Sequence, residues 1–322
     1  MKPADAAVSK PLEELKLAVV IPLFNRRELV LETLASVARQ TMAPWRVVVV
    51  DDGSSDGSPE AVISWLADHP LGCPVEVIRQ PNAGVSAARN RGAAAAEEAD
   101  LLAFLDSDDL WPGDFVAAAL TVFRQDPALV GAAARSEVME CRPDGTIRTL
   151  PGRKPWPQSP RNPVRLVFRA FPGTLAMVVR SAVFRRFGGF PVGVQLGEDA
   201  VFFLLAATAG RWGTLPCGPV TIRRGEIPAG CQAQLTQSTS TDAVVSFAAS
   251  LDLGAQVHGL IRPLRAALAR RWVKAGVALA AAGRREEACE CLRNALLYQS
   301  WNLRTRLRMW CLAAGPPGAP SR

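Results

Sequence analysis

The feature that most constrains the fold is an alternation of short apolar segments with segments of helical periodicity in the N-terminal part of the chain. Short apolar runs bounded by turn residues are typical of buried strands, and apolar residues three or four positions apart are typical of helices. The predicted strands are 17–22, 46–50, 75–78 and 101–105, and the predicted helices are 27–40, 59–66, 85–98 and 115–124. This alternation predicts a three-layer α/β domain with a parallel sheet. Such sheets bind ligands at the carboxyl ends of their strands.

The rest of the chain predicts a second, helical region. We expect a flexible tail at 1–16, the α/β domain at 17–228, a linker rich in Gln, Ser and Thr at 229–250, and the helical region at 251–322. Within these bounds, 142–163 has no clear periodicity. A strand is predicted at 176–179, and helices are predicted at 181–187, 200–209, 272–282, 286–297 and 302–313. A glycine at 283 separates two of these helices and favours an antiparallel pair.

The composition of the chain limits the kinds of binding partner and the cellular compartment that we expect. The 37 Lys and Arg against 30 Asp and Glu give a net charge of +7, which favours phosphates or anionic lipid as partners. The seven cysteines contain no CxxC pair, so neither a disulfide framework nor a zinc ribbon is predicted. The chain has no secretory signal and no apolar run of about 18 residues, which a membrane span requires. We therefore expect a cytoplasmic protein that does not cross a membrane.

Acidic residues gather where apolar segments end. They are Asp51 and Asp52, then Asp106, Asp108 and Asp109, then Glu198 and Asp199. Carboxylates that converge on one crevice repel one another, so a metal ion or a cationic partner must offset their charge. Oxygen ligands without accompanying His or Cys suit Mg²⁺ or Mn²⁺, which in turn suit a diphosphate. The pattern thus predicts a metal site that binds a nucleotide diphosphate.

Several motifs together resemble family 2 glycosyltransferases with the GT-A fold. They are VVIPLFNR at 19–26, VVVVDDGSSDGS at 47–58, NAGVSAARNRG at 82–92, AFLDSDDLW at 103–111 and GED at 197–199. Each motif is weak alone, but their order and their strand and helix context make the set specific over 17–228. The resemblance implies a GT-A three-layer α/β/α sandwich that transfers a sugar from a nucleotide-diphosphate sugar to an acceptor hydroxyl, with inversion. A surface glycan, polysaccharide or glycolipid is the implied acceptor, and no nucleic acid is expected.

The resemblance also implies residues that bind the nucleotide. Pro22, Leu23 and Asn25 would shape the nucleoside pocket. Asp52 would accept a hydrogen bond from the base, which suits uracil and hence a UDP-linked donor; its alternative role is to cap a turn. Arg89 would reach the nucleotide, and its alternative is a solvated position on an alanine-rich helix.

The segment Asp106-Ser107-Asp108 matches the DXD signature of such enzymes. The resemblance implies that Asp108 binds the metal, Mn²⁺ or Mg²⁺, and that Asp106 contacts the ribose or a metal-bound water. Alternation along an extended segment sends Asp106 and Asp108 to the same side. Asp109 either supports the site or caps the turn that follows it, and we favour the cap.

The pair Glu198 and Asp199 matches the acidic pair that precedes a helix in this family, and Asp199 is the implied catalytic base. An acceptor hydroxyl is a poor nucleophile until a base removes its proton, so the reaction needs such a carboxylate. The alternative is that both residues only stabilise the helix N-terminus through its dipole. The two roles are compatible.

The chain departs from the family pattern in one important place. Related enzymes often carry Arg-x-His near the end of the catalytic domain, whereas this chain has Arg223 and Arg224 with no histidine. Either arginine is a candidate to neutralise the diphosphate. The missing histidine also supports an alternative function, a non-catalytic nucleotide-binding scaffold with a partner-recruiting tail.

The tail from about Leu260 resembles a single tetratricopeptide-like hairpin. Its last part, 301–310, interleaves arginines with apolar residues. Two interpretations of this segment stay open. It either packs on the catalytic domain with its arginines solvated, or it makes peripheral contact with anionic lipid headgroups.

Overall fold

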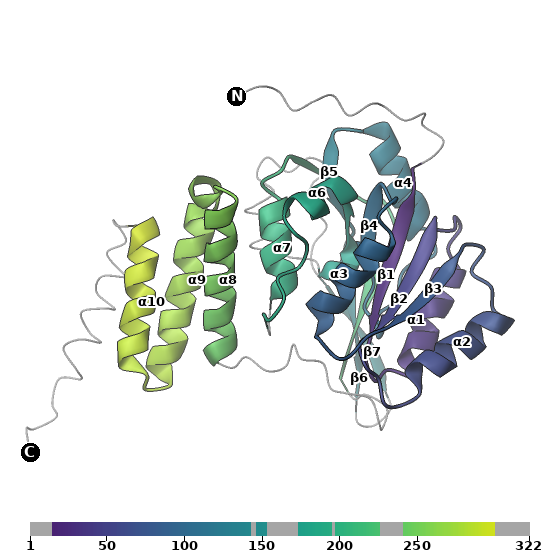
Figure 1. Ribbon diagram of the computed structural model, residues 1–322, viewed down its shortest axis with the longest axis horizontal. Helices are drawn as coiled ribbons and strands as arrows, with labels where there is room; N and C mark the ends of the chain where they lie inside the picture. Colours follow the sequence, from purple (N-terminus) through teal and green to yellow (C-terminus); the bar gives the residue numbers. More distant parts are fainter. Residues whose placement is uncertain (1–14, 143–145, 153–172, 195–196, 226–240, 300–322) are drawn as a thin grey trace, which may run out of the picture. The chain divides into compact units, whose positions relative to one another are not determined.

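The structure is a computed structural model that describes residues 15–142, 146–152, 173–194, 197–225 and 241–299 (Figure 1). The described residues form two compact units. Unit 1 contains the described residues of 15–186 and 210–225, and unit 2 contains 187–209 and 241–299.

Unit 1 is built on a seven-stranded sheet with the strand order β3-β2-β1-β4-β8-β5-β9. The strands are β1 (Leu17–Leu23), β2 (Arg46–Asp51), β3 (Val75–Arg79), β4 (Leu101–Phe104), β5 (Leu129–Ala133), β8 (Met177–Arg180) and β9 (Arg211–Thr214). The four strands predicted in the N-terminal part are confirmed as β1 to β4, which pair in parallel. β8 also lies in the sheet, as predicted for 176–179.

The predicted parallel pairing does not extend to β8, which runs antiparallel to β4 and to β5. Three of the four β8 residues are buried, and an apolar run buried on both faces carries no signal of strand direction. Its direction depends on how the chain returns to the sheet after β5. That return is a tertiary property, so local sequence could not predict it.

Helices cover both faces of this sheet, which confirms the three-layer arrangement (Figure 1). The helices of unit 1 are α1 (Leu29–Ala38), α2 (Ser58–Asp68), α3 (Val85–Ala95), α4 (Phe115–Gln125) and α6 (Ser181–Arg186). Buried residues of α1, α2 and α4 share one core with odd-numbered residues of β1, such as Val19 and Ile21. On the other face, α3 lies against Val20 and α6 places Phe184 5.4 Å from Phe104.

Helix α3 approaches the sheet closely at Gly92. A Cβ atom at this position would lie 2.4 Å from Cγ1 of Val20 and 3.2 Å from Cγ2 of Val50. Both valines are fully buried in the centre of the sheet and have little room to move. The glycine therefore sets the distance between α3, which carries Arg89, and the sheet.

We expect Gly92→Ala to destabilise the protein by about 1–2 kcal/mol, because overpacking outweighs the gain of about 1 kcal/mol in helix propensity. Chemical denaturation measures the change. The control is Ala94→Gly at an exposed position of the same helix, which changes propensity alone. A rise in the free energy of unfolding for Gly92→Ala would contradict the close packing.

A second, three-stranded sheet lies beside the site loops. It has the order β10-β6-β7 and consists of β6 (Ser136–Cys141), β7 (Ile147–Pro151) and β10 (Val220–Gly225). β7 falls within the stretch that the sequence presents as irregular. A bridge between Leu110 and Thr221, with hydrogen bonds of 2.9 and 3.1 Å, attaches β10 to the segment after β4. This bridge positions Arg223.

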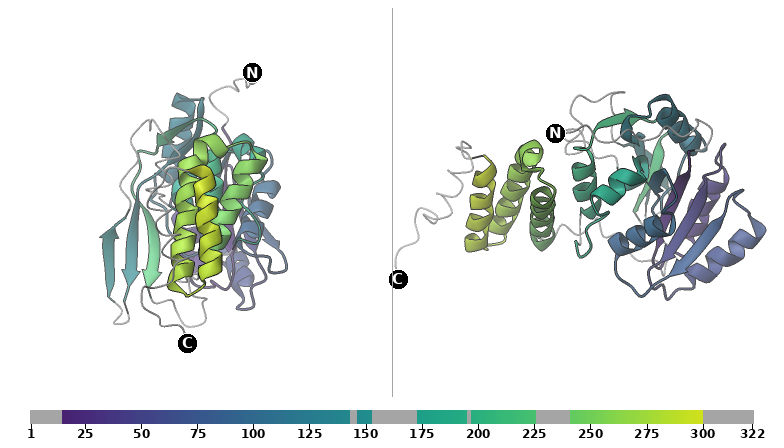
Figure 2. Two further views of the ribbon diagram at one scale, coloured as in Figure 1. Left: turned by 90° about the vertical axis from the view of Figure 1, so that its left-hand side faces the viewer. Right: turned by 45° about the horizontal axis from the view of Figure 1, so that its top comes forward.

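Unit 2 contains α7 (Glu198–Ala206), α8 (Thr241–Val257), α9 (Ile261–Ala281) and α10 (Arg285–Tyr298). α9 packs against both α8 and α10, and α9 and α10 confirm the predicted helix pair (Figures 1 and 2). The buried carboxylate of Asp252 on α8 accepts hydrogen bonds from Trp272 Nε1 of α9 at 2.7 Å and Tyr298 OH of α10 at 2.5 Å. One carboxylate thus joins three helices. The likeness to a tetratricopeptide hairpin stays a prediction.

Two predicted boundaries differ from the structure. The predicted linker 229–250 is too long, because 241–250 already belong to α8. The predicted catalytic domain 17–228 also includes 187–209, which the structure groups with the tail helices. The reason is that all residues of α7 from Val201 to Ala206 are buried, and a helix that is apolar all round needs partners on every side. α8 is one of these partners.

Residues 1–14 of the predicted tail 1–16, and the predicted helix at 302–313, lie outside the described residues. Among the residues that the structure describes, no helix is long and apolar enough to cross a membrane.

Candidate active site

The loops after β1 and β2 are joined by side-chain hydrogen bonds. The Asn25 N–H donates to Ser54 Oγ at 2.9 Å, and the Ser55 N–H donates to Asn25 Oδ1 at 2.8 Å. The Arg26 N–H donates to Ser58 Oγ at 3.0 Å. Asn25 has a φ of 49°, a left-handed conformation that asparagine tolerates better than most residues. These bonds fix the rim of the site above the carboxyl ends of two neighbouring strands.

Pro22 and Leu23 end β1 and are both buried. The Leu23 side chain is 1% exposed and belongs to the core, while its carbonyl oxygen accepts a hydrogen bond from the Asp52 N–H at 2.8 Å. Leu23 therefore contributes its backbone to the site region. The predicted contact of Pro22, Leu23 and Asn25 with a nucleoside stays a prediction.

Asp52 organises the start of α3. Its carboxylate accepts hydrogen bonds from the Ala83 N–H at 2.9 Å, the Gly84 N–H at 2.8 Å and the Gln80 Nε2 at 2.7 Å, and the residue is 3% exposed. Asp52 thus holds the loop before α3, whereas the turn that follows Asp52, whose cap was the alternative role, is capped by Asp51, which accepts a hydrogen bond from the Ser54 N–H at 3.2 Å. An ionised carboxylate offers about four acceptor positions, so one position is left after these three bonds. The two roles of Asp52 are compatible.

Arg89 and Asp106 form an ion pair at the edge of the sheet where β4 ends. Arg89 Nη2 lies 2.6 Å from Asp106 Oδ1, and the two side chains are 5% and 30% exposed. The alternative of a solvated Arg89 is wrong, because α3 turns this residue toward the carboxylates and buries it. Charge-assisted bonds of this length are strong when they are shielded from water.

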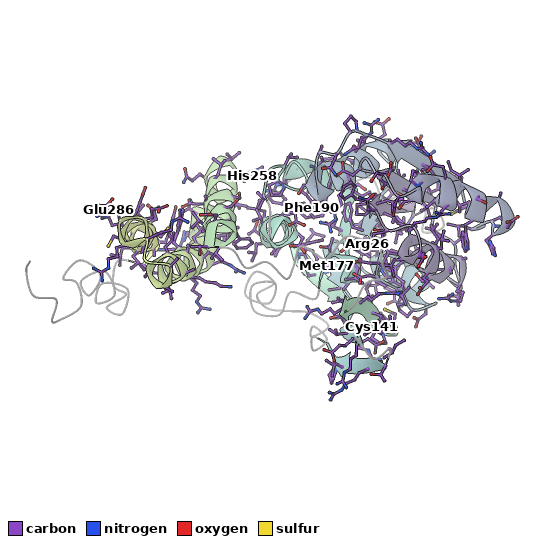
Figure 3. The ribbon with its side chains drawn as sticks, turned by 90° about the horizontal axis from the view of Figure 1, so that it is seen from below. Arg26, Cys141, Met177, Phe190, His258 and Glu286 are labelled. Atoms are coloured by element: carbon purple, nitrogen blue, oxygen red, sulfur yellow. The ribbon has the colours of Figure 1, made fainter. Side chains whose placement is uncertain are left out.

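Asp108 faces a different arginine. Arg26 Nε lies 3.6 Å from Asp108 Oδ2, and the two side chains are 10% and 11% exposed. Arg26 comes from the loop before α1 and is labelled in Figure 3. Sequence reasoning included Arg26 in the motif VVIPLFNR but gave it no role. The structure thus assigns an arginine to each of the two carboxylates of the DXD segment.

Asp109 is buried and contacts α1 and β10. Its carboxylate accepts a hydrogen bond from the Arg223 N–H of β10 at 2.8 Å, and its carbonyl accepts one from Thr33 Oγ1 of α1 at 2.9 Å. Burial, followed by the nearby charges of Asp108 and Asp106, raises the pKa of Asp109 well above its ordinary value. Asp109 therefore joins the segment after β4 to β10. The sequence favoured a narrower role, the cap of the turn that follows Asp109.

The guanidinium of Arg223 also contacts the segment after β4. Its Nε donates to the Asp108 carbonyl at 3.1 Å, and its Nη1 and Nη2 lie 3.4 and 2.6 Å from the two carboxylate oxygens of Glu32 on α1. The Arg223 side chain is 13% exposed, whereas the neighbouring Arg224 is exposed. Of the two arginines that replace the family histidine, Arg223 is therefore the one that contacts the DXD segment.

We expect Arg223→Gln to weaken the binding of UDP with Mn²⁺ by about five- to tenfold, because the loss of two charge-assisted contacts loosens the Asp108 segment. Isothermal titration calorimetry measures the affinity. Arg224→Gln is the matched control, since it removes the same charge from the next residue of the strand. Equal losses of UDP affinity in the two variants would show that Arg223 acts only through its charge and not through its contacts with Asp108 and Glu32.

Glu198 and Asp199 occupy the first turn of α7 in unit 2. Both are partly exposed, and the Ala200 N–H donates to Asp199 Oδ1 at 2.6 Å. A helix N-terminus stabilises negative charge, so this position suits two carboxylates. The other predicted site residues belong to unit 1.

The residues at the end of β4 suit a hard divalent cation that binds together with a diphosphate. Within the described ranges, no three His, Cys, Asp or Glu side chains form a group that could hold a metal by themselves. Mg²⁺-type sites, however, commonly use one or two carboxylates and complete their shell with substrate phosphates and water. Asp106 and Asp108 meet this requirement, because both are oxygen ligands whose charge is at present balanced by arginine.

The three-layer sandwich has the GT-A fold. A family profile described as glycosyl transferase family 2 matches residues 18–187, and the chain belongs to this family.

Curated relatives are similar over part of this region. The chain is 36% identical over 165 residues to validoxylamine A glucosyltransferase of Streptomyces hygroscopicus subsp. limoneus, covering 46% of this chain and 35% of the relative. It is 40% identical over 107 residues to the succinoglycan biosynthesis protein ExoW of Rhizobium meliloti, covering 31% of each. The chain thus aligns with about a third of the length of these two proteins.

Solved structures share the fold. TarS 1–349 of S. aureus in complex with UDP-GlcNAc has a TM-score of 0.59 at 18% identity, covering 92% of this chain and 79% of that one. A mannosyltransferase from Pyrobaculum calidifontis in complex with GDP-Man and Mn²⁺ has a TM-score of 0.50 at 21% identity, covering 97% and 88%.

Proposed function

We propose that this protein is an inverting glycosyltransferase that moves a sugar from a UDP-linked donor to an acceptor hydroxyl. The observation that carries the proposal is the pair of arginine-bound carboxylates at the end of β4, Asp106 with Arg89 and Asp108 with Arg26. When a donor binds, the two arginines can pair with its diphosphate and the two carboxylates can bind a metal ion, in place of the ion pairs that they form with each other. Membership of the family supports this reading.

The nucleotide would bind above the ends of β1 and β2. Asp52 has an acceptor position left for a ring N–H of uracil, next to the rim that Asn25 and Pro22 form. The diphosphate is a dianion or trianion, and Arg89 and Arg26 are the cations of the site that can face it. Both arginines already form ion pairs with carboxylates of the DXD segment. Donor binding would therefore turn the arginines toward the diphosphate and free these carboxylates to bind the metal ion.

Asp108, with Asp106 beside it, would hold Mn²⁺ or Mg²⁺. When bound, the cation supplies electrostatic stabilisation of the negative charge that develops on the departing diphosphate. Arg223, Glu32 and Asp109 would keep the two ligand carboxylates in place by fixing the peptide between residues 108 and 109. The carboxylate of Asp109 is buried and engaged by β10, so it is assigned to the support of the loop.

Asp199 would act as the base, with Glu198 beside it. It would take the proton of the acceptor hydroxyl while that oxygen bonds to the anomeric carbon and the bond from this carbon to the diphosphate oxygen breaks. The nucleoside diphosphate leaves with the electron pair, and attack from the opposite side inverts the anomeric centre.

The acceptor is proposed to be a glycan, polysaccharide or glycolipid. The name of the relative ExoW, a succinoglycan biosynthesis protein, supports a polysaccharide or its lipid-linked precursor. The predicted cytoplasmic location stays a prediction, and so does lipid contact through 301–310, which lie outside the described residues.

A panel of nucleotide sugars tests the proposal. We expect one UDP-sugar to raise the melting temperature in the presence of Mn²⁺ and to lose this effect with EDTA, since a ligand at 100 times its Kd stabilises by about 2.7 kcal/mol. Release of UDP from the same donor, followed by a coupled assay, should also depend on Mn²⁺. Binding without any turnover would favour the scaffold function, and the absence of both would overturn the proposal.

A further inference from the structure

The loop that begins α7 lies directly against a tail helix within unit 2. A Cβ atom at Gly197 would lie 2.3 Å from Cδ2 and 2.7 Å from Cε2 of the Phe247 ring on α8. Phe247 is 5% exposed, and Gly197 has a φ of 82°, which favours glycine for a second reason. No side chain fits between the ring and the backbone that leads into Glu198 and Asp199.

The Phe247 ring is in turn held by α9. The guanidinium carbon of Arg271 lies 4.1 Å from the ring centroid, within the range of a cation–π contact. Arg271 is half-buried, and this burial lowers its pKa. Because a cation–π contact strengthens when it is shielded from water, this contact is stronger than one on the surface. Two tail helices therefore fix the position of one aromatic ring.

α8 also contacts α7 near its other end. A Cβ atom at Gly254 on α8 would lie 3.0 Å from Cδ1 of Leu205 near the other end of α7. In the middle of α7, the Phe202 ring packs against Phe190, which is labelled in Figure 3, with 4.9 Å between the ring centroids. α7 is thus held at both of its ends by α8, and its register along α8 is fixed by two glycines.

From this packing we infer that the tail helices α8 and α9 are a positioning platform for the Glu198–Asp199 pair, and that Phe247 and Gly197 are its positioning residues. The inference rests on the proposed function, in which Asp199 is the base. The oxygen of a base must lie within about 2.6–3.2 Å of the oxygen whose proton it takes. A displacement of about 1 Å can cost about a hundredfold in rate. The tail helices α8 and α9 would then contribute to catalysis through the position of α7.

The test uses the full chain and the pair Phe247→Ala and Leu253→Ala. Both remove a large apolar side chain from α8, but Leu253 is 64% exposed and serves as the matched control. We expect Phe247→Ala to lower the kcat for UDP release from a UDP-sugar by about tenfold or more. The Kd of UDP with Mn²⁺ should stay unchanged, because the residues proposed to bind UDP are in unit 1. Leu253→Ala should change neither quantity.

A second measurement does not depend on activity. Hydrogen exchange followed by mass spectrometry should show faster exchange of the peptide that contains residues 197–206 in Phe247→Ala, and wild-type exchange in Leu253→Ala. Gly197→Ala should also lower kcat, because the new methyl group displaces the ring. The double variant Gly197→Ala with Phe247→Ala should lose no more than about the larger single loss, since both changes act on one contact.

The outcomes separate the two proposals. Unchanged exchange of 197–206 in Phe247→Ala would overturn the packing on which the inference rests. Faster exchange with an unchanged kcat would overturn the positioning role and leave the proposed function intact. A parallel loss of kcat and of UDP affinity would mean general destabilisation and would also overturn it. Absence of turnover by the wild-type protein with every donor would overturn the proposed function itself.

Discussion

Asp199→Asn is expected to lower the kcat of sugar transfer by about 10²–10⁴-fold, the usual contribution of a general base. Asparagine has nearly the same shape as aspartate, and its amide oxygen can still accept the hydrogen bond that Asp199 Oδ1 accepts from the Ala200 N–H. It cannot take up a proton. The variant should therefore fold normally and bind the donor, and the loss should appear in kcat alone.

The measurement is UDP release from the active donor at saturating Mn²⁺, together with the Kd of UDP. Glu198→Gln provides the comparison within the same helical turn. We expect a smaller loss for Glu198→Gln, because the neighbouring carboxylate assists the base and does not take the proton. Retention of wild-type kcat by Asp199→Asn would remove this residue from catalysis and favour the scaffold function, in which both carboxylates only stabilise the start of α7.

Asp108→Asn is the second large effect. We expect it to lower turnover by about 10²–10³-fold, since a bound cation supplies several kcal/mol of charge stabilisation and each 1.36 kcal/mol is a factor of ten. The substitution also leaves Arg26 without its anionic partner, so the local charge becomes more positive. The stabilisation of the protein by Mn²⁺ with UDP should be lost, whereas binding of UDP without metal should persist.

Thermal shift with and without Mn²⁺ measures this effect, and Asp126→Asn is the control. Asp126 also forms an ion pair with an arginine, Arg211, but on the surface away from the DXD segment. A surface pair contributes little, so Asp126→Asn should leave the response to Mn²⁺ unchanged. A normal Mn²⁺ response in Asp108→Asn would assign the cation to other ligands.

The elements of the N-terminal half could be predicted because their signals are local. Apolar runs such as 46–50 are buried whatever their neighbours are, and the strands β1 to β4 lie where this pattern places them. The strands β6 and β7 were harder to predict from the sequence. β6 and β7 are only half-buried or exposed, so they lack the continuous apolar run that indicates a core strand.

In the candidate site, too, some residues could be predicted from local sequence and others could not. The DXD carboxylates and Arg89 could be singled out from motifs, since their residue types and spacing carry the signal. Arg26, Glu32 and Thr33 could not, because their roles depend on contacts with residues more than 70 positions away. The replacement of the missing histidine was left open between Arg223 and Arg224. Strand alternation could not choose between them without the register of β10 against the loop after β4.

The sequence by itself determined the α/β alternation, the family and the carboxylates that gather at strand ends, because these follow from local periodicity and from short motifs. Only the tertiary structure decided which cation faces which carboxylate, that β8 runs antiparallel, and that α7 belongs with the tail helices. The physical reason is that ion pairing and packing are fixed by distances between segments far apart in the chain. No local pattern of residues encodes those distances.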